Sequence, residues 1–125
     1  MQAQRHIDIE VETRYLPGRS DPARSFYFYA YQVTVTNRGG TPCQLVARHW
    51  IISDANGREE EVEGPGVVGQ QPTLQPGESF TYSSGCPLTT TSGSMRGWYH
   101  FIDDDGERFR AEIPAFALTR QEMLN

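Results

Sequence analysis

Hydrophobic and polar residues alternate with a period of two along most of this 125-residue chain. In residues 6–15, Ile7, Ile9 and Val11 share one face, while acidic residues lie between them on the other. Successive side chains of a β-strand point to opposite faces, so this alternation predicts a strand with one buried face. The same pattern predicts strands in residues 26–37, 44–54, 93–103 and 108–118.

Turn signals separate these segments. Residues 16–25 form a polar stretch with two prolines and a glycine, and the Asn-Gly pair at 56–57 and the "DDDG" stretch at 103–106 are typical of hairpin turns. The acidic run 58–63 indicates a solvated strand face or an edge strand. We expect residues 82–93, which are rich in Ser and Thr, to form a loop.

A helical period is present only weakly, in residues 118–125. Six to eight short strands with turns at regular spacing predict an all-β fold, an antiparallel β-sandwich. The chain contains no internal repeat and no linker-like segment, so residues 1–125 are predicted to form one domain.

The net charge and the distribution of apolar residues limit which kinds of partner we expect this chain to have. The chain carries a formal charge of −5, and all eleven basic residues are Arg. This balance argues against a nucleic-acid-binding surface, which needs a basic stripe to displace counterions. No stretch approaches the about 18–20 apolar residues that span a bilayer, so membrane insertion is not expected. The N-terminus has no apolar segment typical of a signal peptide, and we expect a cytoplasmic location.

Two cysteines, Cys43 and Cys86, are present. In a reducing compartment we expect free thiols, with a disulfide between two sheets as the alternative.

Three glycines, Gly64, Gly66 and Gly69, match the pattern G-x-G-x-x-G. In a dinucleotide-binding fold such glycines follow a strand and open a helix whose N-terminus holds the pyrophosphate. Pro72 and Pro76 leave no room for that helix, and no βαβ unit surrounds the motif. The pattern therefore does not indicate a dinucleotide fold.

A weaker hypothesis survives for the same segment. Successive backbone N–H groups of a glycine-rich loop can bind an anion without a helix behind them. Arg58 precedes the loop, and Arg48 and Arg96 lie in flanking predicted strands, so these three arginines are candidate anion ligands. The alternative is that the glycines serve only to turn the chain.

Other reactive residues give no catalytic or metal-binding pattern. His6, His49 and His100 lack metal-ligand spacing, and no C-x-x-C pair is present. No G-x-S-x-G elbow occurs and no base is placed in sequence to activate a nucleophile, so no catalytic residue is predicted.

Two aromatic strand faces remain as candidate binding surfaces. One contains Tyr27, Tyr29 and Tyr31, and the other contains Trp98 and His100. Tyr, Trp and Arg are enriched at binding hot spots, so one face is predicted to bind a partner; packing in the sandwich core is the alternative for each.

Several short motifs occur together and in order along the chain. They are "RHW" at 48–50, "GPGVVGQQP" at 64–72, "PGE" at 76–78, "YSSG" at 82–85, "GSMRGWY" at 93–99 and "IPAFAL" at 113–118. With these motifs the chain resembles the ApaG family over nearly its whole length. The resemblance implies an immunoglobulin-like or fibronectin type III-like sandwich and a link to cobalt resistance and magnesium efflux. It also implies a gene neighbourhood with a diadenosine tetraphosphate hydrolase, and related domains of larger eukaryotic proteins look like interaction modules. It provides no catalytic residue.

These observations lead to one main hypothesis and two alternatives. The main hypothesis is a non-enzymatic protein without a cofactor that binds a protein partner and acts on efflux indirectly, because a chain without a membrane span cannot conduct ions. The first alternative is binding of pyrophosphate or a nucleotide polyphosphate at the loop 64–69. The second is direct binding of Co²⁺ or Mg²⁺ by acidic residues and histidines. Open edge strands would also allow a homodimer.

Overall fold

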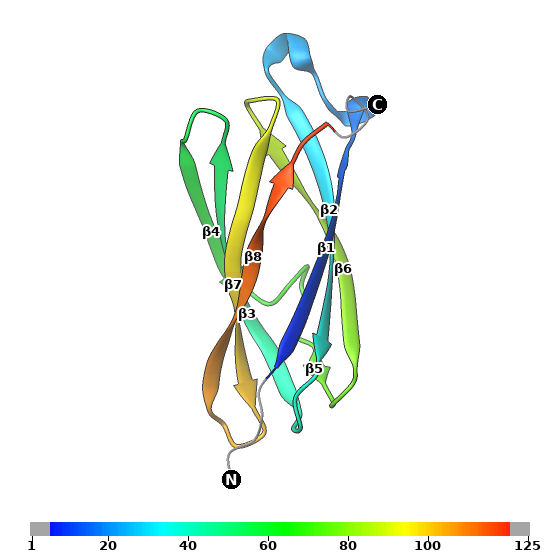
Figure 1. Ribbon diagram of the computed structural model, residues 1–125, viewed down its shortest axis with the longest axis vertical. Helices are drawn as coiled ribbons and strands as arrows, with labels where there is room; N and C mark the ends of the chain where they lie inside the picture. The colour runs from blue at the N-terminus through cyan, green and yellow to red at the C-terminus, as the bar shows by residue number, and fades with distance from the viewer. Residues whose placement is uncertain (1–5, 121–125) are drawn as a thin grey trace.

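The alternating segments form eight strands in the computed structural model, which describes residues 6–120 (Figure 1). In chain order the strands are β1 Ile7–Tyr15, β2 Tyr27–Asn37, β3 Cys43–Asp54, β4 Glu59–Pro65, β5 Thr73–Leu74, β6 Ser79–Leu88, β7 Gly93–Asp103 and β8 Arg108–Leu118. The polar stretch after β1 contains two single 3₁₀ turns, Pro17–Arg19 and Pro22–Arg24.

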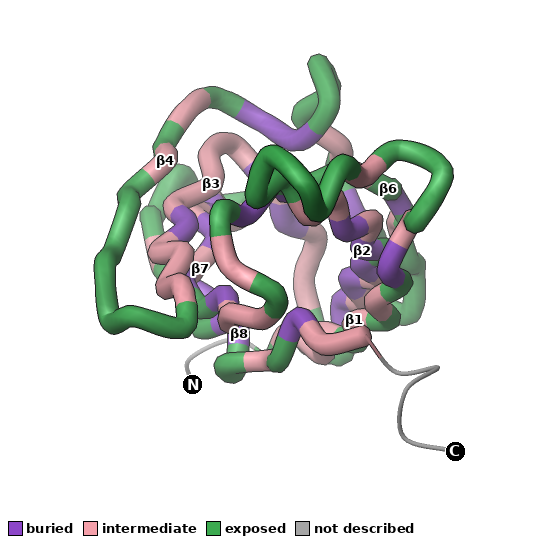
Figure 2. Tube along the Cα trace, turned by 90° about the horizontal axis from the view of Figure 1, so that it is seen from above, coloured by how far each residue is buried: buried purple, intermediate pink, exposed green. Residues whose placement is uncertain are grey.

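The strands build two antiparallel sheets. One has the order β1-β2-β6, and the other has the order β4-β3-β7-β8 with β5 pairing beside β3. Strands β1 and β8 contact each other across the sandwich, and the edges formed by β4 and β6 lie on the side away from them (Figure 2). The predicted all-β, antiparallel sandwich is confirmed, and the acidic run forms the edge strand β4.

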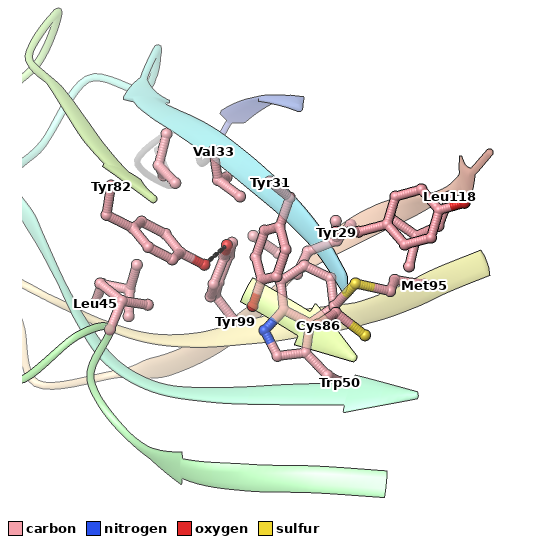
Figure 3. Close-up of a cluster of buried hydrophobic side chains, with 14 of the residues drawn as sticks. Tyr29, Tyr31, Val33, Leu45, Trp50, Tyr82, Cys86, Met95, Tyr99 and Leu118 are labelled. Atoms are coloured by element: carbon pink, nitrogen blue, oxygen red, sulfur yellow. Dashed lines mark hydrogen bonds between the residues drawn. The ribbon is translucent and has the colours of Figure 1, made fainter. Parts of the chain in front are cut away.

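Alternation decides which residues form the core. The first aromatic face is interior, because Tyr29, Tyr31, Val33 and Val35 are buried while Tyr27 is partly buried. Across the gap, Trp50 packs edge-on against Tyr31 and other rings (Figure 3). The second aromatic face, with Trp98 and His100, lies on the outer side of the larger sheet.

The expectation of a loop at residues 82–93 is wrong for most of its length. Strand β6 continues to Leu88, which pairs with Tyr27 of β2. Tyr82, Cys86 and Leu88 are buried on the inner face, whereas Ser83, Gly85 and Pro87 between them are exposed. Because this segment is rich in Ser and Thr, the alternation of buried and exposed positions is not visible in its sequence. The weak helical period also fails at its start, because Leu118 ends β8; residues 121–125 lie outside the described residues.

Both cysteines are buried free thiols, and the alternative disulfide is not formed. Cys43 lies in β3 and Cys86 in β6. Burial raises the pKa of each thiol to about 11, so both stay protonated and poorly nucleophilic near neutral pH.

Candidate functional site

The glycine-rich segment, residues 66–72, joins β4 to β5. Val67 is fully buried. Its N–H donates to the Gln70 carbonyl at 2.8 Å, and the Gln70 N–H donates back to the Val67 carbonyl at 2.9 Å. Val68 and Gly69 between them have φ of 41° and 82°. Positive φ at both central residues is the requirement of a type I′ turn, which is why Gly69 suits this position.

Three N–H groups of the loop, those of Gly66, Val67 and Gln70, bond within the protein. The Gly66 N–H donates to the Val46 carbonyl of β3 at 2.9 Å. Gly66 itself has a φ of 61°, and a Cβ there would collide with the Gln70 carbonyl oxygen. Among residues 6–120, the loop N–H groups of Val68 and Gly69 have no partner. The anion-binding hypothesis therefore stays a prediction that concerns these two groups.

Arg48 is the arginine that lies beside the loop. It projects from the inner face of β3, opposite Gly64 of β4. Its Nη1 donates to the carbonyl oxygens of Pro65 at 3.0 Å and Gly66 at 3.1 Å. A Cβ on Gly64 would lie 3.2 Å from both terminal nitrogens of this guanidinium. Gly64 thus provides the room in which Arg48 holds the loop against β3.

The other two candidate arginines lie elsewhere. Arg58 precedes β4 at the end opposite Gly64, which corresponds to roughly 20 Å along an extended strand. Arg96 is on β7 and pairs with Glu59, with Nη1 and Oε2 3.3 Å apart. The structure therefore brings Gly64, Gly66, Gly69 and Arg48 together, and it does not add Arg58 or Arg96 to them.

A tyrosine pair lies in the core below Arg48. The hydroxyls of Tyr82 in β6 and Tyr99 in β7 are 2.5 Å apart, so the pair bridges the two sheets (Figure 3). Burial raises the pKa of both hydroxyls, and also that of Tyr31 beside them. These groups remain protonated at neutral pH, which suits a structural link between the sheets.

A second group of side chains covers the outer face of the larger sheet, and we call it the Trp98 cluster: Trp98, His49, His100 and Arg110. The His49 ring stacks on Trp98 with centroids 4.2 Å apart and planes 12° apart. The Arg110 guanidinium lies 3.9 Å from the centroid of the same indole. The indole Nε1 donates to Nε2 of His100 at 3.1 Å. Stacking on one aromatic surface fixes side chains from three strands.

Carboxylates surround the Trp98 cluster. The two ring nitrogens of His49 lie 2.8 Å from a Glu61 oxygen and 2.9 Å from a Glu63 oxygen. Arg110 pairs with Glu112 at 2.8 Å. In the range 6–120 no group of three or more His, Cys, Asp or Glu residues is arranged to hold a metal ion. Within the same range no helix has the length and apolarity that a membrane crossing requires.

The sequence revealed only part of the Trp98 cluster. Trp98 and His100 were candidates because they share one face of a predicted strand. His49 and Arg110 were not linked to them, because the link depends on register: His49 is opposite Trp98, and Arg110 is opposite His100. The alternation within a strand shows which side chains share a face of the sheet. Only the pairing of strands shows which side chains of neighbouring strands lie next to one another.

Comparisons with known proteins give a consistent result. The family model described as the ApaG domain matches residues 17–103. A protein named Protein ApaG from Bdellovibrio bacteriovorus is 53% identical over 112 residues, which is 90% of this chain and 88% of the relative. Protein ApaG from Acidithiobacillus ferrooxidans is 54% identical with the same coverage. A crystal structure of a Bordetella pertussis protein has a TM-score of 0.90 and 49% identity, over 92% of this chain and 94% of that one. With a matching sandwich and about half of its residues shared with these relatives, the chain belongs to the ApaG family.

Proposed function

We propose that this chain is a non-enzymatic protein that binds a protein partner through the outer face of its larger sheet, and that it affects cobalt resistance and magnesium efflux only through that partner. The observation that supports this proposal is the Trp98 cluster. Trp and Arg are enriched in binding hot spots, where they lie at the centre of an interface with a polar rim. Here the rim consists of Glu61, Glu63 and Glu112.

The stacking also lowers the entropic cost of binding. His49 and Arg110 are already held against the Trp98 ring in the free protein. Ordering a flexible side chain at an interface costs about 0.5–1.5 kcal/mol, so side chains ordered beforehand leave more of the contact energy for affinity.

Affinity capture with matched variants tests the proposal. Wild-type protein and Trp98→Ala are immobilised, together with Thr34→Ala, which alters the outer face of the other sheet. We expect the same partner on wild type and Thr34→Ala, and loss of that partner on Trp98→Ala. Circular dichroism and thermal unfolding check that each variant is folded. Capture that is identical on all three proteins, or no specific capture, contradicts the proposal.

An indirect role also predicts the behaviour of the cations themselves. Calorimetric titration with Co²⁺ and with Mg²⁺ should give no saturable heat. Saturable binding of either ion would replace the indirect role with direct binding.

A second candidate function is binding of pyrophosphate or a nucleotide polyphosphate at the glycine-rich loop. It is supported by the unpartnered N–H groups of Val68 and Gly69 among the described residues. Titration with pyrophosphate should then move the amide resonances of Val68 and Gly69 before those elsewhere. Unchanged resonances at millimolar ligand remove this candidate.

A further inference from the structure

Strand β6 leaves one of its edges unpaired. Its register with β2 is continuous from Tyr27–Leu88 to Thr36–Ser79, and it pairs with no other described strand. Figure 1 shows β6 at the margin of the three-stranded sheet.

Pro87 shows which residues of β6 direct their backbone N–H and carbonyl groups away from β2, toward the unpaired edge. Proline has no N–H, and its partner Phe28 uses its own N–H and carbonyl toward Ser20 and Leu16, away from β6. The Phe28–Pro87 pair is therefore a non-hydrogen-bonded pair. Residues at the same parity as Pro87 direct their N–H and carbonyl groups to the open edge. These residues are Ser79, Thr81, Ser83 and Gly85, and all four are exposed or face solvent.

The other edges carry charge, whereas β6 does not. Strand β4 contains four glutamates in its seven residues, and β1 contains Asp8, Glu10 and Glu12. Strand β8 carries Arg and Glu together with Pro114. Charges and prolines on an edge block unwanted strand pairing. Strand β6 has no charged residue and its single proline, Pro87, is near its end, so residues 79–85 form an edge without this protection.

A groove lies next to the C-terminal end of this open edge, between β6 and the β3–β4 hairpin. It has a volume of about 350 Å³, and its lining residues are Ile52, Asp54, Arg58, Glu59, Glu60, Pro87, Leu88 and Thr89. Ile52, Pro87 and Leu88 supply apolar surface. The groove has a net negative charge, because its lining has three carboxylates and a single guanidinium, that of Arg58.

Glu60 of β4 lines the groove together with Pro87 and Leu88 of β6. It pairs in register with Ile52, on the inner face of β4, and its charge adds to burial in raising the pKa of Cys86 on β6. Within residues 6–120 it forms no ion pair, whereas Glu59 is paired with Arg96 and Asp54 accepts N–H groups of its own turn. An inward carboxylate that forms no ion pair favours a positively charged ligand group.

We propose that the open edge of β6 binds an extended segment of another protein as an added strand, with an Arg or Lys side chain of that segment directed into the groove at Glu60. The backbone of the segment would pair with Thr81, Ser83 and Gly85, and alternate side chains would point into the gap between the sheets. This site is on the β4–β6 side of the sandwich and shares no residue with the Trp98 cluster, so each can be lost without the other.

A peptide selection provides the first test. Random phage-displayed peptides of about eight residues, an ordinary strand length, are selected on wild-type protein. They are then counter-selected on Ser83→Pro, which removes one edge N–H without adding charge. We expect enriched peptides with alternating side chains and at least one Arg or Lys, whose binding weakens as salt is raised. The absence of peptides that discriminate between the two proteins overturns the proposal.

Matched pairs of variants provide the second test, with fluorescence anisotropy of the enriched peptide as the readout. Ser83→Pro should weaken binding about tenfold or more, whereas Ser83→Ala should not change it. Ser83→Lys should weaken binding and Ser83→Glu should not, although both place a long charged side chain at the same position. This charge pair keeps the test valid if the proline variant does not fold. Glu60→Gln should weaken binding about threefold, with Glu10→Gln on the exposed face of β1 as the charge-matched control.

Each contrary result has a separate meaning. Equal binding by the Ser83 variants excludes the edge, and equal binding by Glu60→Gln excludes the basic segment. Sedimentation of wild-type protein as a dimer that Ser83→Pro dissociates would make a second copy the occupant and overturn the proposed partner. A partner captured through Trp98 but unaffected by these variants would leave the proposed function standing and remove this inference.

Discussion

The glycines of the loop are required for three different physical reasons. Gly64 gives room to the Arg48 guanidinium, Gly66 combines a positive φ with a close carbonyl, and Gly69 supplies a positive φ at an open turn. A pattern of three glycines can therefore match a nucleotide-binding fingerprint while each glycine serves the packing of the loop.

Alanine substitutions should separate these reasons. Gly66→Ala should destabilise the protein by about 3 kcal/mol, because both the backbone conformation and the Gln70 carbonyl oppose a Cβ. Gly69→Ala meets no atom within 4 Å and should cost about 1 kcal/mol for its φ alone. Urea unfolding measures both values. Equal losses would show that the collision at Gly66 is relieved by movement of the loop.

A substitution at Val68 should stabilise the protein. Val68 is a β-branched residue at a φ of 41° and is 55% exposed, so it carries strain and gains little from burial. Val68→Asn would place Asn-Gly in a type I′ turn and should raise the free energy of unfolding by about 0.5–1 kcal/mol. Val68→Leu serves as control, since it keeps an apolar side chain without the Asn preference for this conformation. A loss of stability in Val68→Asn would contradict the assignment of the turn.

At the scale of elements, two strands from different sheets meet through one polar contact. Tyr82 and Tyr99 pair their hydroxyls in a core that is otherwise largely apolar. A buried hydroxyl without a partner costs about 1–3 kcal/mol, so each member of the pair depends on the other.

A double-mutant cycle should reveal this dependence. Tyr82→Phe and Tyr99→Phe should each destabilise the protein by about 1–3 kcal/mol, because each leaves one hydroxyl unsatisfied. The double variant should lose less than the sum, because no unpaired hydroxyl remains. The measurement is the free energy of unfolding in urea. Additive losses would indicate that the two hydroxyls do not interact.

The strands themselves were predictable from the sequence, and their partners were not. Alternation placed Tyr29 and Tyr31 on one face of their strand, and only the structure shows that this face is the buried one. It failed where hydroxyls replaced apolar residues, as at Ser83 and Ser84 of β6. For the site, the sequence grouped Arg48, Arg58 and Arg96 with the loop, and the structure places only Arg48 beside it. Closeness along the chain does not report which end or face of a strand a residue occupies.

At the scale of the whole molecule, the buried cysteine thiols and tyrosine hydroxyls should make the folded protein less stable at high pH. Free thiols lose their protons near pH 9 and free tyrosines near pH 10. In the folded protein the pKa of Cys43 and Cys86 is about 11, and those of Tyr31, Tyr82 and Tyr99 are raised in the same direction. Above pH 9 the unfolded chain therefore binds fewer protons than the folded protein, and the free energy of unfolding falls as pH rises.

The expected result is full stability below pH 9 and progressive loss between pH 9 and 11. Urea unfolding across this range measures it. Replacing both cysteines with Ala should remove the part of the loss that begins near pH 9 and leave the part caused by the tyrosines. Constant stability up to pH 11 would show that the thiols and hydroxyls ionise without unfolding.

The sequence alone determined the architecture of this protein, because a period of two makes each segment a strand and sorts its side chains onto two faces, of which a two-sheet sandwich buries one. It also determined the turns, where Asn-Gly and Asp-Gly permit the required backbone conformations. Only the tertiary structure decided the surfaces that carry the proposals. The stacking of His49 and Arg110 on Trp98 and the meeting of Glu60 with the end of β6 depend on register and on how one sheet lies over the other. Those relations arise from packing between distant segments, which no local pattern encodes.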